Sequence, residues 1–472
     1  MTAVTADRVA RVMRSAGEYG NDASNSPAST ALAECIATFQ RHLHLPDPGA
    51  VYVTLAAVAA NRAEGDPLWL LLVGPPGGGK TEIAGALSGL PDVHPAATLT
   101  EAALLSGTPA KDKSPTAKGG LLREIGPFGI ILCKDFGSVL SMHRESRAVL
   151  LAALREIYDG QWTRHVGSDG GRTLAWSGKV GFIGGVTPAI DSHHAVMGSL
   201  GERFVLFRLP SFDQDAQARR ALQHLGSERR MRSELALSVR AALEAADPVA
   251  LVAPPSGDLA EELVLLSTLA VRCRSDVERD GYSREIVLIP EAEAPARLAL
   301  VLLRLWNGLQ AIGADLETTR HLVTKCALDS MPQLRRRVIE QLMEHGRLST
   351  PAIADLIGYP TLTTRRGCED LAGHGVLERA RGGSGKPDVW AVTTWVRERW
   401  PSESEMSPEA KSASEMSGEI PKAQENGTKP PSLSSPLPIE EDNSDSLRAE
   451  ALREFDIDDE TLERWASEEV DS

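Results

Sequence analysis

The feature that most constrains this chain is a glycine-rich loop between an apolar run and a helix-forming run. GPPGGGKT at residues 74–81 follows the apolar run Leu68–Val73 and precedes EIAGALSGL. It has the form GxxxxGK[ST], in which backbone N–H groups curl around a phosphate. The alternative is a glycine-rich turn that contains Lys-Thr by chance, but the flanking strand and helix favour a phosphate-binding loop. We expect ATP and Mg²⁺ as cofactors, bound by Gly74, Pro75, Pro76, Gly77, Gly78, Gly79, Lys80 and Thr81.

Lys80 and Thr81 have distinct expected roles in this loop. The ammonium of Lys80 would reach the β- and γ-phosphates, and the hydroxyl of Thr81 would be a metal ligand. A second metal-side group is expected at the end of a neighbouring buried strand. The best candidate is Asp135, which follows the apolar run Gly129–Cys133. An Asp135 that only caps the turn is the alternative.

The residues around Asp135 depart from the usual pattern of four apolar residues followed by Asp-Glu. Here the triplet is Lys134-Asp135-Phe136. If Asp135 takes the Asp place, Phe136 replaces the catalytic Glu; if it takes the Glu place, Lys134 replaces the metal-side Asp. Nucleotide binding survives either reading, because the loop supplies most of the phosphate contacts. The sequence therefore predicts a candidate ATP hydrolase with an atypical second acidic motif.

Periodicity divides the chain into segments of different class. The chain has 472 residues, about three domains in length, and 42% of them are hydrophobic. Strands alternate with helices over 68–209, which predicts an α/β fold with a mostly parallel sheet, and residues 211–333 are almost wholly helical in pattern. Residues 334–400 predict three short helices and a hairpin with a glycine-rich tip, as in a winged helix. The expected segments are a partly disordered helical one (1–45), an α/β core (46–210), a helical lid (211–333), a winged helix-turn-helix domain (334–400) and a disordered acidic tail with a short terminal helix (401–472).

Composition excludes several classes of protein. No run approaches ~18 uninterrupted apolar residues and the N-terminus lacks a signal-type apolar core, so we expect a cytoplasmic protein with no membrane contact. Five cysteines lie far apart without a CxxC pair, which predicts small buried residues rather than disulfides or zinc ligands. The net charge of −15 is concentrated in residues 401–472, with 6 Lys+Arg against 20 Asp+Glu. Residues 334–400 carry 11 against 8, the sign that contact with DNA requires.

The run GGLLREIGPFGIILCKDFGSVLSMHRESRAVLLAALREIYDGQWTRHVGSDGGRTLAWSGKVGFIGGVTP resembles the core of AAA+ P-loop ATPases in the clade of the minichromosome-maintenance helicases. It is more similar still to ATPases with a C-terminal winged helix that mobile elements of bacteria and phages encode. The resemblance covers about Leu68 to Trp400. It implies a ring-like homo-oligomer with ATP bound between protomers.

The resemblance assigns catalytic roles to three further residues. Thr187, in FIGGVTP, looks like the sensor-1 residue that positions the attacking water. Arg203, in GERFVLFRL, resembles the arginine finger that reaches a neighbouring subunit's γ-phosphate; an ordinary salt-bridged arginine is the alternative. Arg297, at the start of PARLALVLLRLWNGL, matches the sensor-2 arginine; a solvent-facing arginine at a helix N-terminus is the alternative.

Two elements are candidates for DNA contact. The hairpin QWTRHVGSDGGRTLAW alternates over Trp162–Val166 and Arg172–Trp176, and the corresponding insertion of the helicases points into a DNA channel; a plain surface hairpin is equally compatible with the pattern. In a winged helix the third helix enters the major groove and the wing touches phosphates. The expected DNA-binding residues are Thr363, Thr364, Arg365, Arg366, Arg379, Arg381 and Lys386. Winged helices also serve as protein-interaction modules.

The sequence thus predicts an ATPase that couples ATP binding or hydrolysis to DNA through a winged helix. A nucleotide-gated DNA-binding transcriptional regulator with little hydrolysis is the first alternative, favoured by the Lys134-Asp135-Phe136 triplet. An ATPase that remodels a protein partner, captured through the acidic tail, is the second.

Overall fold

The computed structural model describes residues 26–106, 119–167, 171–193, 203–211, 213–383 and 385–406. Contacts group Met1–Met416 into one compact unit, and the segment borders expected near residues 45, 210 and 333 lie inside it. Of the expected acidic tail, only residues 401–406 lie within the described part of the chain.

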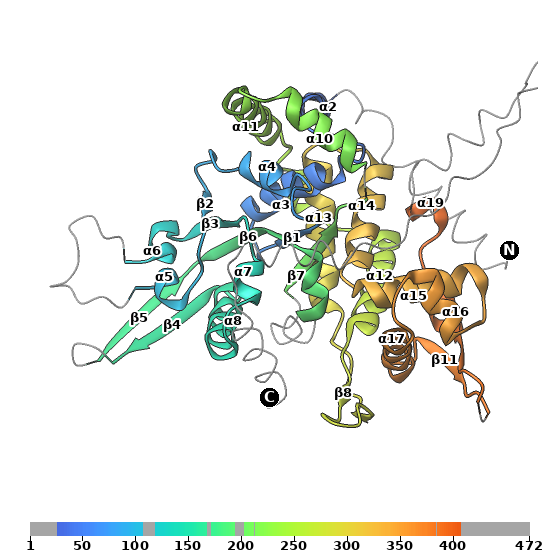
Figure 1. Cartoon of the computed structure of the whole chain (residues 1–472). Coiled ribbons are helices and arrows are strands. Elements are labelled where there is room, and N and C mark those ends of the chain that lie inside the picture. The colour runs from blue at the N-terminus through green and yellow to red at the C-terminus, as the bar shows by residue number, and fades with distance from the viewer. Residues whose placement is uncertain are drawn as a thin grey trace, which may run out of the picture. The chain divides into compact units, whose positions relative to one another are not determined.

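A five-stranded parallel sheet organises the first half of the chain (Figure 1). Its order is β2-β3-β6-β1-β7, and every neighbouring pair is parallel. All five residues of β1 are buried, as expected for a strand covered on both faces. The predicted α/β class with a mostly parallel sheet is confirmed. The strands are β1 (Trp69–Val73), β2 (Val93–Pro95), β3 (Phe128–Cys133), β6 (Lys179–Val186) and β7 (Phe204–Arg208).

Alternate residues of the strands enter two separate cores. Leu70 and Leu72 of β1 lie with Phe207 in one core, to which helices α3 (Gly49–Arg62) and α13 (Ala296–Ala311) also contribute. Trp69 and Leu71 lie in the other core, with helix α8 and the hairpin β4–β5. The helices around the sheet are α2 (Pro27–His42), α3 (Gly49–Arg62), α4 (Lys80–Gly85), α5 (Glu101–Leu104), α6 (Leu121–Ile125), α7 (Gly137–Leu140) and α8 (Arg144–Tyr158), with the 3₁₀ helix η4 (Pro188–His193).

The hairpin of β4 (Gln161–Val166) and β5 (Arg172–Ser177) pairs antiparallel, with Trp162 opposite Trp176. Its predicted strands are confirmed, and residues 168–170 of its tip lie outside the described residues. The five cysteines are buried and unpaired with one another, as expected.

The following segment is helical but contains a hairpin that the periodicity did not predict. Strands β8 (Glu278–Arg279) and β9 (Ile286–Leu288) pair antiparallel around Asp280-Gly281, a dipeptide typical of turns. The expectation of an almost wholly helical segment misses this hairpin. Its helices are α10 (Gln214–Gln223), α11 (Glu228–Glu244), α12 (Gly257–Arg274), α13 (Ala296–Ala311) and α14 (Leu316–Asp329), with the 3₁₀ helix η5 (Ala250–Val252).

Residues 333–400, the C-terminal module, have three helices followed by a hairpin, the order expected from the sequence. The buried Trp390 of the hairpin donates from Nε1 to Thr350 Oγ1 (2.9 Å), which fixes the sheet against the helices. Its elements are α15 (Gln333–His345), β10 (Leu348–Ser349), α16 (Thr350–Ile357), α17 (Thr361–Gly373), β11 (Leu377–Ala380), β12 (Val389–Val392) and α18 (Thr394–Arg397). The short α19 (Glu403–Met406) follows and contacts α14.

Candidate nucleotide site and nucleic-acid interface

Three of the predicted site segments meet at one edge of the sheet. The carboxyl ends of parallel strands share an edge, where open α/β sheets bind ligands. β6 lies between β1 and β3, and the last residues of β6 accept hydrogen bonds from the loops that follow both neighbours. Gly74 N donates to Val186 O (3.1 Å), and Phe136 N donates to Gly185 O (2.8 Å). The glycine-rich loop, the Asp135 turn and Thr187 therefore lie together at the carboxyl ends of β1, β3 and β6, the position of the ligand crevice in such sheets.

The glycine-rich loop has a conformation that only glycine adopts without strain. Gly77 and Gly79 have φ of 75° and 83°. A Cβ added at either position would meet nothing within 4 Å, so glycine is required there for its backbone conformation and not for lack of space. At Gly78 the added Cβ would lie 3.0 Å from Pro75 O, so here the loop's own close turn excludes a side chain.

Lys80 reaches back inside the loop. Its Nζ donates to Gly74 O (2.5 Å) and Pro75 O (2.6 Å), and the residue is only 9% exposed. Burial lowers the pKa of Lys80, and the nearby Asp135 carboxylate opposes that shift. The carboxylate of Asp135 thus lies near enough to Lys80 to affect the charge of its ammonium.

Asp135 and Phe136 of the atypical triplet lie in different surroundings. Phe136 is fully buried, with its ring 5.2 Å from that of Phe204 and 5.7 Å from that of Phe182. It is a core residue and does not stand in for a catalytic glutamate in the crevice. Asp135 is exposed, and its Oδ1 accepts from Gly137 N (2.9 Å). The carboxylate therefore accepts a hydrogen bond at the start of α7, as in the turn-capping alternative, and its metal-side role stays a prediction.

Oxygen donors suited to Mg²⁺ lie at this edge. The Thr81 hydroxyl and the Asp135 carboxylate are hard oxygen ligands, which Mg²⁺ takes in ones and twos together with substrate phosphates. This fits the residues present, although no group of three or more His, Cys, Asp or Glu placed to hold a metal occurs among the residues that the structure describes. A cavity of about 350 Å³ lies beside the loop, lined by Gly74, Pro75, Pro76, Arg208, Gln214 and Gln217 among others.

Next to this cavity lies an ionic cluster that the sequence did not reveal. The buried Asp329 accepts from Arg208 N (2.7 Å) and from Lys325 Nζ (2.7 Å), and it also pairs with Arg336. The Arg208 guanidinium binds both oxygens of Asp191 (2.8 and 2.7 Å). These five residues, the Asp329 cluster, join β7, η4, α14 and α15. Arg208 and Asp329 are 121 positions apart, so no local pattern could have predicted their contact, whereas Lys325 lies one helical turn before Asp329.

Arg203 and Arg297 lie at the amino-terminal ends of the strands, opposite the end that carries the glycine-rich loop. Arg203 precedes β7, whose first residue is level with the first residue of β1. Its Nη2 binds Asp159 (2.9 Å), and its guanidinium lies 5.2 Å from the Tyr158 ring centre. Arg297 and Tyr158 line one cavity of about 430 Å³ together with Asp66, which precedes β1. Arg297 therefore lies away from the phosphate loop of its own chain, and its sensor-2 role stays a prediction.

In the β4–β5 hairpin, Arg164 is held against the rest of the protein. Arg164 Nη1 donates to Leu105 O (2.6 Å), and its Nη2 lies 3.1 Å from Glu101. His165 Nδ1 is 3.1 Å from Thr173 Oγ1 across the hairpin. These contacts favour the plain surface hairpin for the described part of this element.

The C-terminal module presents only part of its predicted DNA-binding set. Thr364 is fully buried and its hydroxyl donates to Pro360 O (3.2 Å), so its predicted DNA contact is wrong. The reason is helical spacing, because Thr364 shares the core face of α17 with Cys368 and Leu371. Arg365 pairs with Glu369 (3.0 Å), and Arg379 pairs with Asp388 (2.6 Å).

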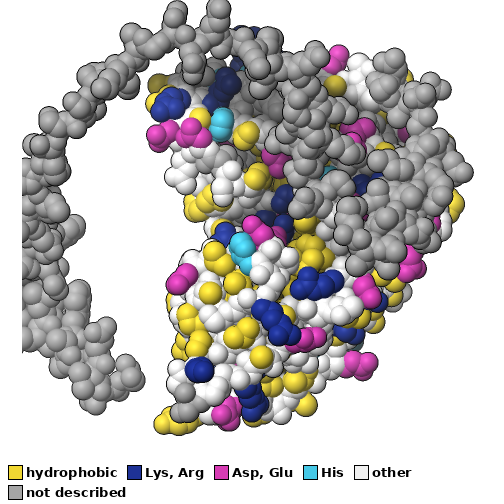
Figure 2. Space-filling view, turned by 90° about the vertical axis from the view of Figure 1, so that its right-hand side faces the viewer, with side chains coloured by type: hydrophobic (Ala, Val, Ile, Leu, Met, Phe, Trp, Pro, Cys, Tyr) yellow, Lys and Arg dark blue, Asp and Glu magenta, His cyan; other side chains and the backbone are white. Residues whose placement is uncertain are grey.

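The remaining residues of that set are more accessible. Thr363, Arg381 and Lys386 are exposed, and Arg366 is half-buried. Figure 2, which views the molecule from the side of this module, shows Lys and Arg side chains interspersed with Asp and Glu rather than gathered into one basic field. Charge therefore favours a contact made by a few cations at the wing and at the start of α17.

Comparisons with known proteins add no identity. A scan against models of protein families found no match, and a search of the curated proteins found none. Within the described residues, no helix has the length and apolar character needed to cross a membrane.

Proposed function

We propose that this chain is a P-loop ATPase of the AAA+ type that couples ATP binding to DNA through a C-terminal winged helix. The observation that carries the proposal is the meeting of Lys80, Asp135 and Thr187 at the carboxyl ends of a parallel sheet, around a loop with positive φ at two glycines. If the Gly-Lys-Thr sequence were a chance turn, nothing would lead us to expect a carboxylate from the end of another strand beside it.

Each residue of the crevice has a role that its position supports. The loop N–H groups and Lys80 hold the β- and γ-phosphates, and Thr81 and Asp135 hold Mg²⁺, which neutralises phosphate charge when bound. Thr187 orients the attacking water from the end of β6. Because Phe136 lies in the core, the crevice lacks the usual second carboxylate at this turn. Asp135 then serves the metal, and we expect slow hydrolysis.

The amino-terminal ends of the strands support action between subunits. Arg203 and Arg297 both lie near Tyr158, whose pKa burial raises to about 12 while these arginines oppose the shift. They are too far along the strands to reach the phosphate loop of their own chain. A second copy placed against this end of the strands would bring its γ-phosphate near Arg297, as in a homo-oligomeric ring. Arg203, whose side chain is 8% exposed, would have to leave its pair with Asp159 to reach the same phosphate.

The C-terminal module supports DNA contact through its wing. Three helices and a β-hairpin form the winged-helix arrangement, in which wing and helix N-terminus touch phosphates. Arg381 and Lys386 are exposed on the wing. The Asp329 cluster joins α15 of this module to β7 beside the phosphate loop, which gives a physical route from nucleotide to DNA.

A nucleotide-gated regulator with little turnover is the second candidate, and the buried Phe136 favours it. A protein-remodelling ATPase is a third, but its docking arm, the acidic tail, lies outside the described residues beyond Met406.

The deciding experiment is steady-state ATP hydrolysis by the purified full chain, with and without duplex DNA. We expect slow turnover that DNA stimulates, and stimulation that falls in the double variant Arg381→Ala, Lys386→Ala. Tight ATP binding without turnover under both conditions would select the regulator, and absence of both binding and turnover would refute the proposal.

A further inference from the structure

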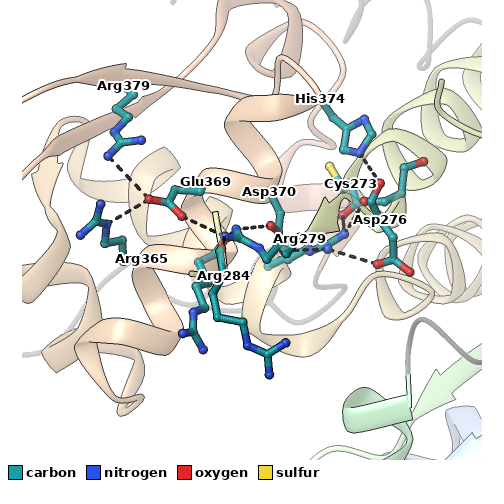
Figure 3. A network of polar contacts seen from close by, with 12 residues as sticks. Cys273, Asp276, Arg279, Arg284, Arg365, Glu369, Asp370, His374 and Arg379 are labelled. Atoms are coloured by element: carbon teal, nitrogen blue, oxygen red, sulfur yellow. Dashed lines mark hydrogen bonds and ion pairs between the residues drawn. The ribbon is translucent and has the colours of Figure 1, made fainter. Parts of the chain in front are cut away.

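The β8–β9 hairpin (residues 278–288) is held along helix α17 by ion pairs (Figure 3). Arg279 Nη2 binds Asp370 (2.6 Å) and the backbone oxygen of Arg366 (3.1 Å). Its Nη1 binds Glu369 (3.2 Å) and Arg284 O (2.8 Å). The Arg279 side chain thus bridges the hairpin and the middle of α17.

Contacts at the base of the hairpin continue this attachment. Arg335 Nη2 lies 3.0 Å from Asp370 and 3.4 Å from Asp276, and His374 Nε2 lies 3.1 Å from Asp276 O. A Cβ added to Gly373 would lie 3.2 Å from Ile289 Cδ1. The hairpin therefore runs from the C-terminal end of α17 towards its middle.

The covered face of α17 is the one turned away from the module's core. Thr364, Gly367, Cys368 and Leu371 form the buried stripe. At 100° per residue, the positions that the hairpin contacts lie on the far side of the helix, at residues 366, 369, 370 and 373. In a winged helix this far side points into the major groove. The first turn of α17 remains open, since Leu362 is 58% exposed.

Groove dimensions decide what this coverage means. A helix with its side chains is about 10–12 Å across, and the major groove is about 12 Å wide, so it admits a helix or a two-stranded ribbon but not both. The presence of the hairpin on this face therefore opposes insertion of α17 on steric grounds.

We propose that the β8–β9 hairpin is a gate over the groove-reading face of α17, and that duplex DNA binds fully only when the hairpin swings away. This inference rests on the proposed DNA-binding function of the module. With the hairpin in place, the wing and the first turn of α17 meet the DNA backbone; with the hairpin released, the middle of α17 reaches the groove.

A variant that releases the hairpin tests the gate, because the gate predicts that it binds DNA more tightly. Arg279→Ala removes the bridge, while Asp370 keeps Arg335, and Glu369 keeps Arg365 at 3.0 Å. Loss of a cation near DNA weakens binding by itself, so a gain can come only from uncovering the helix. We expect the affinity of the full chain for duplex DNA, measured by fluorescence anisotropy, to rise at least about fivefold. The apparent affinity is the affinity of the open form multiplied by the fraction of molecules in which the hairpin is released, and the variant raises that fraction.

A locked variant tests the same idea in the other direction. The pair Gly373→Cys, Ile289→Cys places two thiols where the added Cβ and the Ile289 side chain meet, and the five native cysteines are buried. We expect oxidation to weaken duplex binding at least about fivefold relative to the same protein after reduction. The reduced form is the matched control for folding.

The wing variant Arg381→Ala, Lys386→Ala separates the gate from the function on which it rests. If this variant binds DNA more weakly than the natural chain, the module is a DNA-binding one. The gate is then refuted if Arg279→Ala binds no tighter than the natural chain, or if oxidation of the locked pair leaves affinity unchanged. If no form binds duplex DNA at low salt, the proposed function fails and the gate fails with it.

Discussion

Replacing Asp329 by Asn should destabilise the whole described fold. The Asp329 carboxylate is 1% exposed, and its Oδ2 accepts from both Arg208 N and Lys325 Nζ, while its Oδ1 meets Arg336. An amide has one oxygen, so its NH₂ group would face a donor and one partner would lose its acceptor. It also leaves the cations Lys325 and Arg336 without the charge that balances them.

Breaking a buried ion pair by removing one partner costs about 3–5 kcal/mol, and we expect a loss of this size in the free energy of unfolding. Urea denaturation followed by circular dichroism gives the difference from the shift in midpoint at constant slope. Glu340→Gln is the matched control, because Glu340 also pairs with Arg336 (2.7 Å) but is 35% exposed, so its loss should cost less than about 1 kcal/mol. A loss below about 1 kcal/mol in Asp329→Asn would show that the cluster does not hold β7, α14 and α15 together.

Three further predictions test other parts of the account. Arg203→Ala should keep ATP binding but lose turnover, and mixing it with a Lys80 variant should restore some activity if fingers act between subunits; a monomeric mass without complementation contradicts the ring. Phe136→Ala should cost about 3–5 kcal/mol of stability, as the loss of a core aromatic does, and unchanged stability would show that Phe136 is not part of the core. Burial lowers the pKa of Lys179 to about 8 from 10.5, so the unfolded chain binds more protons between those pH values and stability should rise with pH there. Lys179→Met should flatten that rise in a denaturation series, and an identical pH profile in both proteins would show that Lys179 does not cause it.

The sheet and the phosphate loop could be predicted because their signals are local. The apolar run before Gly74 forms β1, the run before Lys134 forms β3, and both were visible as uninterrupted stretches. Positive φ at Gly77 and Gly79 is what the motif itself requires. Short-range pattern was enough wherever one segment fixes its own conformation.

Other features depend on contacts between distant segments. Neither the contact of Arg208 with Asp329 nor that of Arg279 with α17 leaves a mark in the neighbouring sequence, because the partners are about 90 or more positions apart. The buried position of Thr364 is different, since its spacing to Cys368 and Leu371 was readable as a core stripe. The Asp280-Gly281 turn signal was also present in the sequence, inside a segment expected to be helical.

Equilibrium binding of ATP·Mg²⁺ by the full chain, measured by titration calorimetry, tests the central claim most directly. We expect the natural chain to bind and Lys80→Ala to lose at least about tenfold in affinity, the value of one charge-assisted hydrogen bond to phosphate. Lys134→Ala, which removes an exposed lysine beside Asp135, is the matched control and should bind as the natural chain does. Unchanged affinity in Lys80→Ala, or an equal loss in both variants, would contradict the assignment of residues 74–81 as the nucleotide site.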